Sequence, residues 1–192
     1  FEVLSAAYLQ TLPYTSEVSL QQSLLYATDA VEQALLLEPN NPVFVAELGL
    51  IQEFSNQFDL AEKSYKKAIL LKSDYVQAYF DLARLYEKQN TIDAAISTYE
   101  EYRVIDSQNR DVLYELGRLY YNRRHEGDDK RAEKIWLSAV KIDPDFSNAL
   151  YSLGLLYEKR GEYALAGEYF KKVYSLNPGN KDVDKKLKSL SL

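Results

Sequence analysis

The sequence predicts an all-α protein, a right-handed α-solenoid of about five antiparallel helix pairs with a C-terminal capping helix. Three observations support this prediction. A pattern of small and aromatic residues returns about every 34 residues, apolar residues within each period follow helical spacing, and no segment has the pattern of a β-strand. We therefore expect each period to form one pair of helices.

The period is clearest at two small residues. The first of them follows a leucine, in the pairs Leu48-Gly49, Leu82-Ala83, Leu116-Gly117 and Leu153-Gly154. The second recurs as Ala27, Ala61, Ala95, Ala132 and Ala166. Successive positions of this second mark are 34 residues apart, except for one step of 37. An aromatic side chain follows it by four residues in Tyr65, Tyr99, Trp136 and Phe170. Several marks in one register indicate true internal repeats.

Residues 76–109 show how one period predicts two helices. One helix face is formed at positions i, i+3, i+4 and i+7 by Tyr79, Leu82, Ala83 and Tyr86. The chain breaks at Gln89-Asn90, and a second apolar face begins at Ile92. The stretches "NQFD", "NTID" and "RGEY" lie between the two helices of their repeats, and we expect polar turns there that cap the second helices.

These marks divide the chain into repeats that form a single solenoid domain over residues 1–192. The expected boundaries are 1–41 with an insertion, 42–75, 76–109, 110–146 with a three-residue insertion, 147–180, and a capping helix at 181–192. Phe1 to Tyr8 fit the start of a first helix, but about ten extra residues precede Ala27 and Pro13 interrupts them. In the last segment, Val183, Leu187 and Leu190 fall on one face, as a cap for the last repeat requires.

Over nearly its whole length, the sequence resembles the tetratricopeptide repeat family. In that family the small residue of the first helix faces the small residue of the second, so that the two backbones approach closely. The resemblance implies the pairs Gly154 with Ala166, Gly117 with Ala132, and Ala83 with Ala95. Such packing would offset the cost of about 1 kcal/mol that a glycine carries inside a helix.

Composition excludes several classes of function. The formal net charge of −6 disfavours nucleic-acid binding and attachment to anionic lipid. No apolar run approaches the length that spans a bilayer, so we expect no direct membrane insertion of this segment. The chain starts at Phe1 and contains no methionine, so we expect a processed product or part of a longer protein. It contains no cysteine either, which excludes disulfides, thiolate zinc sites and cysteine nucleophiles. Both a cytoplasmic and an extracytoplasmic bacterial location stay open.

Nothing in the sequence predicts catalysis, a cofactor or a metal site, so we expect a protein that is not an enzyme. The only histidine, His125, lies in the inserted turn beside Glu126, Asp128 and Asp129. Their spacing fits no calcium-loop or zinc template. We expect a solvated polar turn at this point.

The resemblance places one set of side chains on the first helices, where family members line their concave groove. It combines aromatic platforms with acids and arginines, the aromatic and arginine side chains being those that concentrate binding energy at interfaces. The members are Glu47, Phe54, Phe80, Asp81, Arg84, Tyr114, Glu115, Arg118, Tyr121 and Tyr151. We expect this groove to bind a peptide segment or a protein surface. A second interpretation of the charges stays open, in which they form i, i+3 pairs on a solvated face.

The resemblance also argues against one type of ligand. Chaperone-binding members of the family hold a C-terminal carboxylate with lysines and asparagines on the first helices. The matching positions here are Phe80, Asp81, Tyr114 and Glu115. We therefore expect a mixed or partly basic segment, or a folded surface, as the partner.

Two alternative functions remain. The chain could form homo-oligomers through its N-terminal edge, because an array that begins within a repeat exposes apolar surface there. It could also be the soluble accessory tail of a larger membrane enzyme. The stretch "AVEQALLLEPNNP" in the first repeat is similar to the repeat regions of bacterial O-antigen polymerase- and ligase-like membrane proteins.

Overall fold

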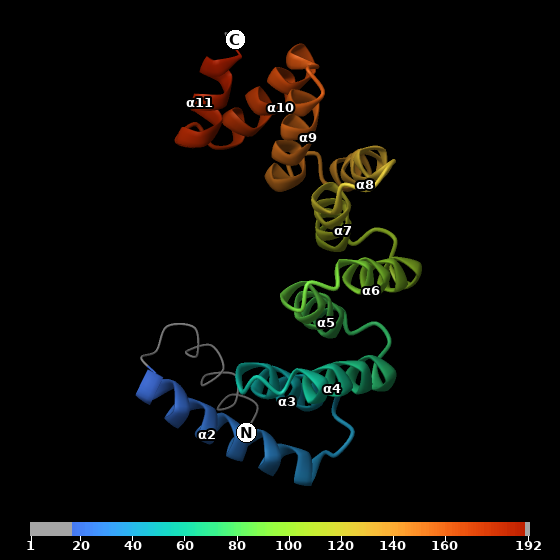
Figure 1. Cartoon of the computed structure of the whole chain (residues 1–192), viewed down its shortest axis with the longest axis vertical. Coiled ribbons are helices and arrows are strands. Elements are labelled where there is room, and N and C mark those ends of the chain that lie inside the picture. Colours follow the sequence, from blue (N-terminus) through green and yellow to red (C-terminus); the bar gives the residue numbers. More distant parts are fainter. Residues whose placement is uncertain (1–16, 191–192) are drawn as a thin grey trace. The chain divides into compact units, whose positions relative to one another are not determined.

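The all-α fold is confirmed by a computed structural model, which describes residues 17–190. These residues form ten helices and no strand (Figure 1). The helices are α2 Glu17–Leu37, α3 Pro42–Phe54, α4 Phe58–Leu71, α5 Val76–Lys88, α6 Ile92–Ile105, α7 Arg110–Arg123, α8 Asp128–Ile142, α9 Ser147–Lys159, α10 Tyr163–Leu176 and α11 Lys181–Ser189. The helix expected near Phe1 to Tyr8 lies outside the described residues.

The helices form a helical repeat solenoid. In chain order, the full repeats contain α3 and α4, α5 and α6, α7 and α8, and α9 and α10, while α2 precedes them as the second helix of the first repeat. The helices α3 and α4, α7 and α8, α9 and α10, and α10 and α11 are in contact. The chain divides into two compact units, Phe1–Thr98 and Tyr99–Leu192. We call them the N-terminal half and the C-terminal half and describe each by itself.

A left-handed backbone position follows the first helix of each of the four full repeats. It recurs at Asn56, Asn90, Arg124 and Gly161, with φ angles of 58°, 60°, 60° and 78°. Asparagine and glycine adopt this conformation at low cost, which explains the recurring turn chemistry. In the fourth repeat, the three extra residues follow Arg124 and end at Gly127, which also has a positive φ of 81°. The insertion is thus placed directly after the recurring turn.

Two of the three expected side-chain caps are absent, and asparagines cap other helices. Gln57 before α4 and Glu162 before α10 make no side-chain capping hydrogen bond, so the caps predicted at "NQFD" and "RGEY" are absent. Asparagines cap α3, α7 and α11 instead: Asn41, Asn109 and Asn180 each accept hydrogen bonds from backbone N–H groups of the first turn.

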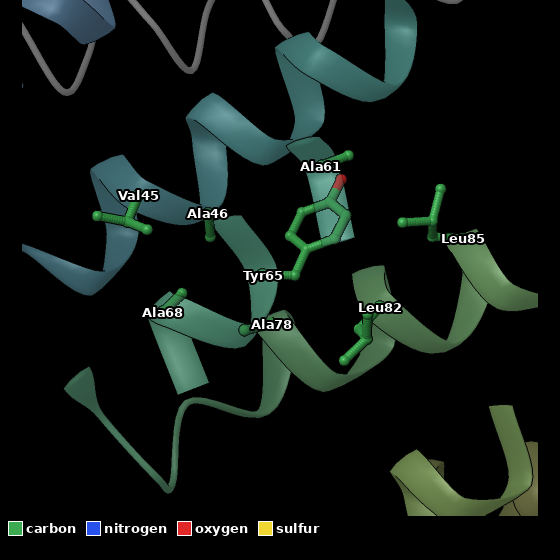
Figure 2. Packing of buried hydrophobic residues seen from close by; sticks show 8 residues of the cluster. All are labelled: Val45, Ala46, Ala61, Tyr65, Ala68, Ala78, Leu82 and Leu85. Atoms are coloured by element: carbon green, nitrogen blue, oxygen red, sulfur yellow. The ribbon is translucent and has the colours of Figure 1, made fainter. Parts of the chain in front are cut away.

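In the N-terminal half, the core is centred on Tyr65 of α4. Its ring lies among small and aliphatic side chains of α3, α4 and α5 (Figure 2). The other members of this cluster are Val45, Ala46, Ala61, Ala68, Ala78, Leu82 and Leu85. Because alanines surround one large ring, the three helices pack closely on it.

The glycines of the first helices face aromatic rings. A Cβ atom on Gly154 would lie 2.6–3.0 Å from three atoms of the Phe170 ring, and one on Gly49 would lie 2.7 Å from the Tyr65 ring. Gly117 meets the Trp136 ring in the same way. The family resemblance implied an alanine opposite each glycine. The nearest atoms belong instead to the aromatic residue four positions after that alanine, because the large ring fills the space that the missing Cβ leaves.

Tyrosines of the first helices connect neighbouring repeats. Tyr86 donates a hydrogen bond of 2.9 Å to Glu62 within the N-terminal half. In the C-terminal half, Tyr157 donates one of 2.7 Å to Glu133. Each bond runs from a first helix to the second helix of the preceding repeat. The sequence predicted an apolar helix face at Tyr86, and the structure adds a charge-assisted bond at the hydroxyl groups of both tyrosines.

Tyr157→Phe is expected to lower the free energy of unfolding by about 1.5 kcal/mol, because it removes a hydrogen bond to a charged partner beside a buried ring. Chemical denaturation measures this change. The matched control is Tyr163→Phe on α10, whose side chain is exposed and which should change stability by less than about 0.5 kcal/mol. Equal effects of the two substitutions would contradict a role for the Tyr157 hydroxyl.

Candidate functional site

In the N-terminal half, two buried carboxylates hold an arginine at the surface. Asp81 of α5 lies 3.0 Å from Arg84 Nη2 and accepts a hydrogen bond of 3.1 Å from Gln77. Glu53 of α3 lies 3.5 Å from the same Nη2 atom and accepts a hydrogen bond of 3.1 Å from the Tyr65 hydroxyl. The side chain of Arg84 remains 52% exposed. We call these five residues the carboxylate cluster.

The electrostatics of the carboxylate cluster explain how Arg84 is positioned. Burial raises the pKa of Asp81 above its ordinary value of 3.8, and the Arg84 charge opposes this shift. Asp81 therefore holds Arg84 in position, and little of the Asp81 side chain itself is exposed. The sequence analysis did not single out Glu53. Its register, in which Glu87 and Glu158 recur, could have pointed to it.

The remaining predicted residues of the N-terminal half are dispersed. Glu47 and Phe80 are half-buried on α3 and α5. Phe54 packs toward the cluster of Ala27, Val31 and Ile51. Of the predicted set in this half, Asp81 and Arg84 are in direct contact.

In the C-terminal half, three predicted tyrosines lie half-buried on first helices, and an aromatic ring supports each of them. Tyr114 of α7 meets Phe146 edge to face at a centroid distance of 5.7 Å. The partners of the other two come from second helices: Tyr121 packs on Trp136 at 5.6 Å, and Tyr151 of α9 packs on Phe170 at 5.5 Å. These contacts fix the rings while leaving part of each exposed.

A charge pair lies among these tyrosines. Arg118 Nε donates a hydrogen bond of 2.6 Å to Glu115 on the same helix. Burial, followed by the nearby Glu115 charge, raises the pKa of Tyr114 above 10 and keeps its hydroxyl protonated at neutral pH. Because Tyr114, Arg118 and Tyr121 are spaced i, i+4, i+7, they share one face of α7. The set Tyr114, Glu115, Arg118, Tyr121 and Tyr151 is called the tyrosine patch below.

The inserted turn before α8 is more ordered than a solvated polar turn. His125 and Glu126 are exposed, as expected, but Asp128 is fully buried. Asp128 accepts hydrogen bonds from Arg123, at 2.8 and 2.9 Å, from Arg131 at 2.9 Å, and from the backbone N–H of His125 at 2.9 Å. The Asp128 carboxylate thus holds the turn in place. The sequence alone did not distinguish it from the neighbouring acids.

The described residues contain neither a metal-binding group nor a membrane-spanning helix. Across residues 17–190, no group of three or more histidine, aspartate or glutamate side chains is arranged to hold a metal ion. In the same part of the chain, no helix combines the length and the apolar character needed to cross a membrane. The tyrosine patch presents half-buried aromatic rings, and both sites present a guanidinium group held by carboxylates.

Repeat units of this kind define a class of helical protein-interaction scaffolds, and comparison with known proteins supports that assignment. Models of the tetratricopeptide repeat match residues 46–110 and 147–180, together about half of the chain. The chain belongs to the tetratricopeptide repeat family. Members of this family generally bind protein partners, and the fold is typically non-catalytic.

Solved structures agree with this assignment. A crystal structure of MamA has a TM-score of 0.67 at 25% sequence identity, covering 84% of this chain and 95% of its own. A second MamA structure has a TM-score of 0.64 at 23% identity, covering 98% and 96%. A tetratricopeptide repeat protein from Parabacteroides merdae has a TM-score of 0.72 at 18% identity, covering 97% and 72%. No curated protein matches the chain by sequence. The similarity to glycan polymerases and ligases stays a prediction from sequence.

Proposed function

We propose that this chain is a non-catalytic scaffold that binds a peptide segment of a partner protein on the tyrosine patch. The observation that carries the proposal is the support given to the three half-exposed rings of Tyr114, Tyr121 and Tyr151 by Phe146, Trp136 and Phe170. A ring that is already fixed loses little conformational entropy on binding, so its contact area contributes fully to affinity. Tyrosine is also a residue type enriched among binding hot spots.

The charges of the patch favour a mixed or partly basic ligand. Arg118 is held by Glu115, so the pair can accept a cation on one side and an anion on the other. In the N-terminal half, Arg84 of the carboxylate cluster is exposed in a similar way and is held by Asp81 and Glu53. We infer that Glu47 and Phe54 of α3 and Phe80 of α5 add contacts to a ligand bound on the N-terminal half. An interface of about 800 Å² per partner with micromolar affinity is typical of such binding.

Peptide display on the purified chain tests the proposal. We expect enriched peptides whose binding weakens at least about tenfold in the double variant Tyr114→Ala/Arg118→Ala, because two anchor side chains are removed. The matched control is Tyr163→Ala/Lys171→Ala on α10, which removes the same kinds of group from exposed positions outside the patch. Circular dichroism confirms that both variants stay folded. If the selection enriches no peptide on the folded chain, the proposal is wrong.

Self-assembly is a second candidate, and the surface of α2 favours it. Leu25, Leu36 and Leu37 are 67%, 73% and 71% exposed there. Exposed apolar side chains gathered on one helix indicate a contact with another surface. Sedimentation at several protein concentrations distinguishes this function from peptide binding, because only self-assembly makes the mass depend on concentration.

A further inference from the structure

A hollow lies between three helices of the C-terminal half, on a different side of α7 from the tyrosine patch. Its volume is about 260 Å³, and α6, α7 and α8 line it. Leu113 and Ile135, both buried, contribute apolar walls. Arg103, Arg131 and Lys134 bring three positive charges to the same hollow. It can therefore take a group with an apolar stem and a negative end.

The hollow's single acidic lining residue is already engaged. Glu100 accepts hydrogen bonds from the Tyr120 hydroxyl at 3.0 Å and lies 2.5 Å from Arg103. Arg131 is oriented by the buried Asp128 at 2.9 Å. Lys134 forms no ion pair with any residue that the structure describes. The hollow thus combines two positioned guanidinium groups with one available ammonium group.

A second hollow of about 360 Å³ continues from the first over the outer face of α8, with Lys134 and Ser138 shared between them. Lys130, Lys134, Leu137 and Lys141 follow one another at i, i+4, i+7 and i+11, which places them on one helix stripe. The acid beside this stripe, Glu133, is occupied by Tyr157 and Arg160. We call Lys130, Lys134, Leu137 and Lys141 the lysine stripe.

This surplus of positive charge is local. The chain as a whole has a formal net charge of −6, and its first 62 residues contain nine acidic residues and no lysine or arginine. A long polyanion such as nucleic acid, or an anionic membrane, would meet repulsion from the rest of the chain. A short acidic segment can contact the lysine stripe alone. Charge complementarity therefore favours a peptide over the larger polyanions.

We propose that the hollow and the lysine stripe form a second interaction surface, which binds an acidic segment of a partner protein. A glutamate side chain of that segment enters the hollow, where its methylene groups contact Leu113 and Ile135. Its carboxylate lies between Arg103, Arg131 and Lys134. Further acids of the segment pair with Lys130 and Lys141. This surface is independent of the tyrosine patch.

Fluorescence anisotropy with a labelled octaglutamate peptide tests this proposal, with octaglutamine as the uncharged comparison. The variant Lys130→Glu/Lys134→Glu should weaken octaglutamate binding at least about tenfold, because attraction becomes repulsion at the surface. The matched control Lys181→Glu/Lys185→Glu changes the net charge equally at exposed positions of α11 and should weaken it less than about threefold.

A further variant tests the hollow without changing charge. Ser138 lines both hollows, and its hydroxyl donates only to the Lys134 carbonyl oxygen, so Ser138→Trp should fill the space and weaken binding about fivefold in the folded protein. Tyr114→Ala/Arg118→Ala should leave it unchanged, which separates this surface from the tyrosine patch. Equal losses in both charge-reversal variants, unchanged binding in Ser138→Trp, or binding of anionic vesicles or oligonucleotides in place of octaglutamate would each overturn the proposal.

Discussion

Asp128→Asn is expected to lower the free energy of unfolding by about 3 kcal/mol, because it removes the charge that pairs with Arg123 inside the protein. Asp128 is fully buried, and the side chain of Arg123 is only 17% exposed. Asparagine could still accept one hydrogen bond, but it could not satisfy the guanidinium groups of both Arg123 and Arg131. Urea denaturation at neutral pH measures the loss.

The neighbouring Asp129 supplies a matched control. It also lies in the first turn of α8, but it is partly exposed and pairs with Lys159 at 2.8 Å on the surface. Asp129→Asn should therefore cost less than about 1 kcal/mol. If both substitutions cost the same small amount, burial of the Asp128 pair would contribute nothing beyond a surface ion pair.

The same carboxylate should make stability depend on pH. Hydrogen bonds from Arg123 hold the pKa of Asp128 well below its ordinary value of 3.8, although burial acts in the opposite direction. The unfolded chain therefore takes up a proton first as the pH falls. The stabilisation from Asp128 is fully present above about pH 4 and is lost progressively at lower pH. Asp128→Asn should accordingly flatten the fall in stability below pH 4, measured by denaturation across this range.

Gly117→Ala is expected to lower the free energy of unfolding by about 2 kcal/mol, although alanine is the better helix former by about 1 kcal/mol. The new Cβ would lie 2.6 Å from Cδ1 of Trp136. That ring cannot move aside easily, because it is 2% exposed and its Nε1 donates a hydrogen bond of 3.1 Å to the Tyr114 carbonyl oxygen. Thermal and urea unfolding both report the change.

Two further glycine substitutions test the same explanation, one at a crowded position and one at an open position. Gly154→Ala should be destabilising as well, because its Cβ would come within 2.6 Å of the buried Phe170 ring. Gly179→Ala should change stability by less than about 0.5 kcal/mol, since its Cβ would meet nothing closer than Asn177 Oδ1 at 3.6 Å. If Gly117→Ala raises the free energy of unfolding, the Trp136 ring can move aside at no cost in stability, which would contradict this explanation.

Much of the tyrosine patch could be predicted from the sequence, but its supporting contacts could not. The family resemblance placed Tyr114 and Arg118 on a first helix, and both residues lie on α7. The rings behind Tyr121 and Tyr151 are Trp136 and Phe170, which come from second helices. The sequence showed those aromatics as repeat marks without indicating which side chain each would support.

The repeat period and the helix pairs could be predicted from the sequence, and Asn56, Asn90 and Gly161 are residue types that suit the left-handed turn in which they lie. These features depend on local backbone preferences and on side-chain spacing within a single helix, both of which are written in consecutive residues. The burial of particular carboxylates could not be predicted in this way. Asp81 and Asp128 look like any surface acid in the sequence, and Glu53 meets Arg84 across 31 residues of chain. The burial of these carboxylates depends on side chains that packing brings from other helices. The same side chains shift the pKa values of Asp81 and Asp128 and determine which surfaces remain exposed.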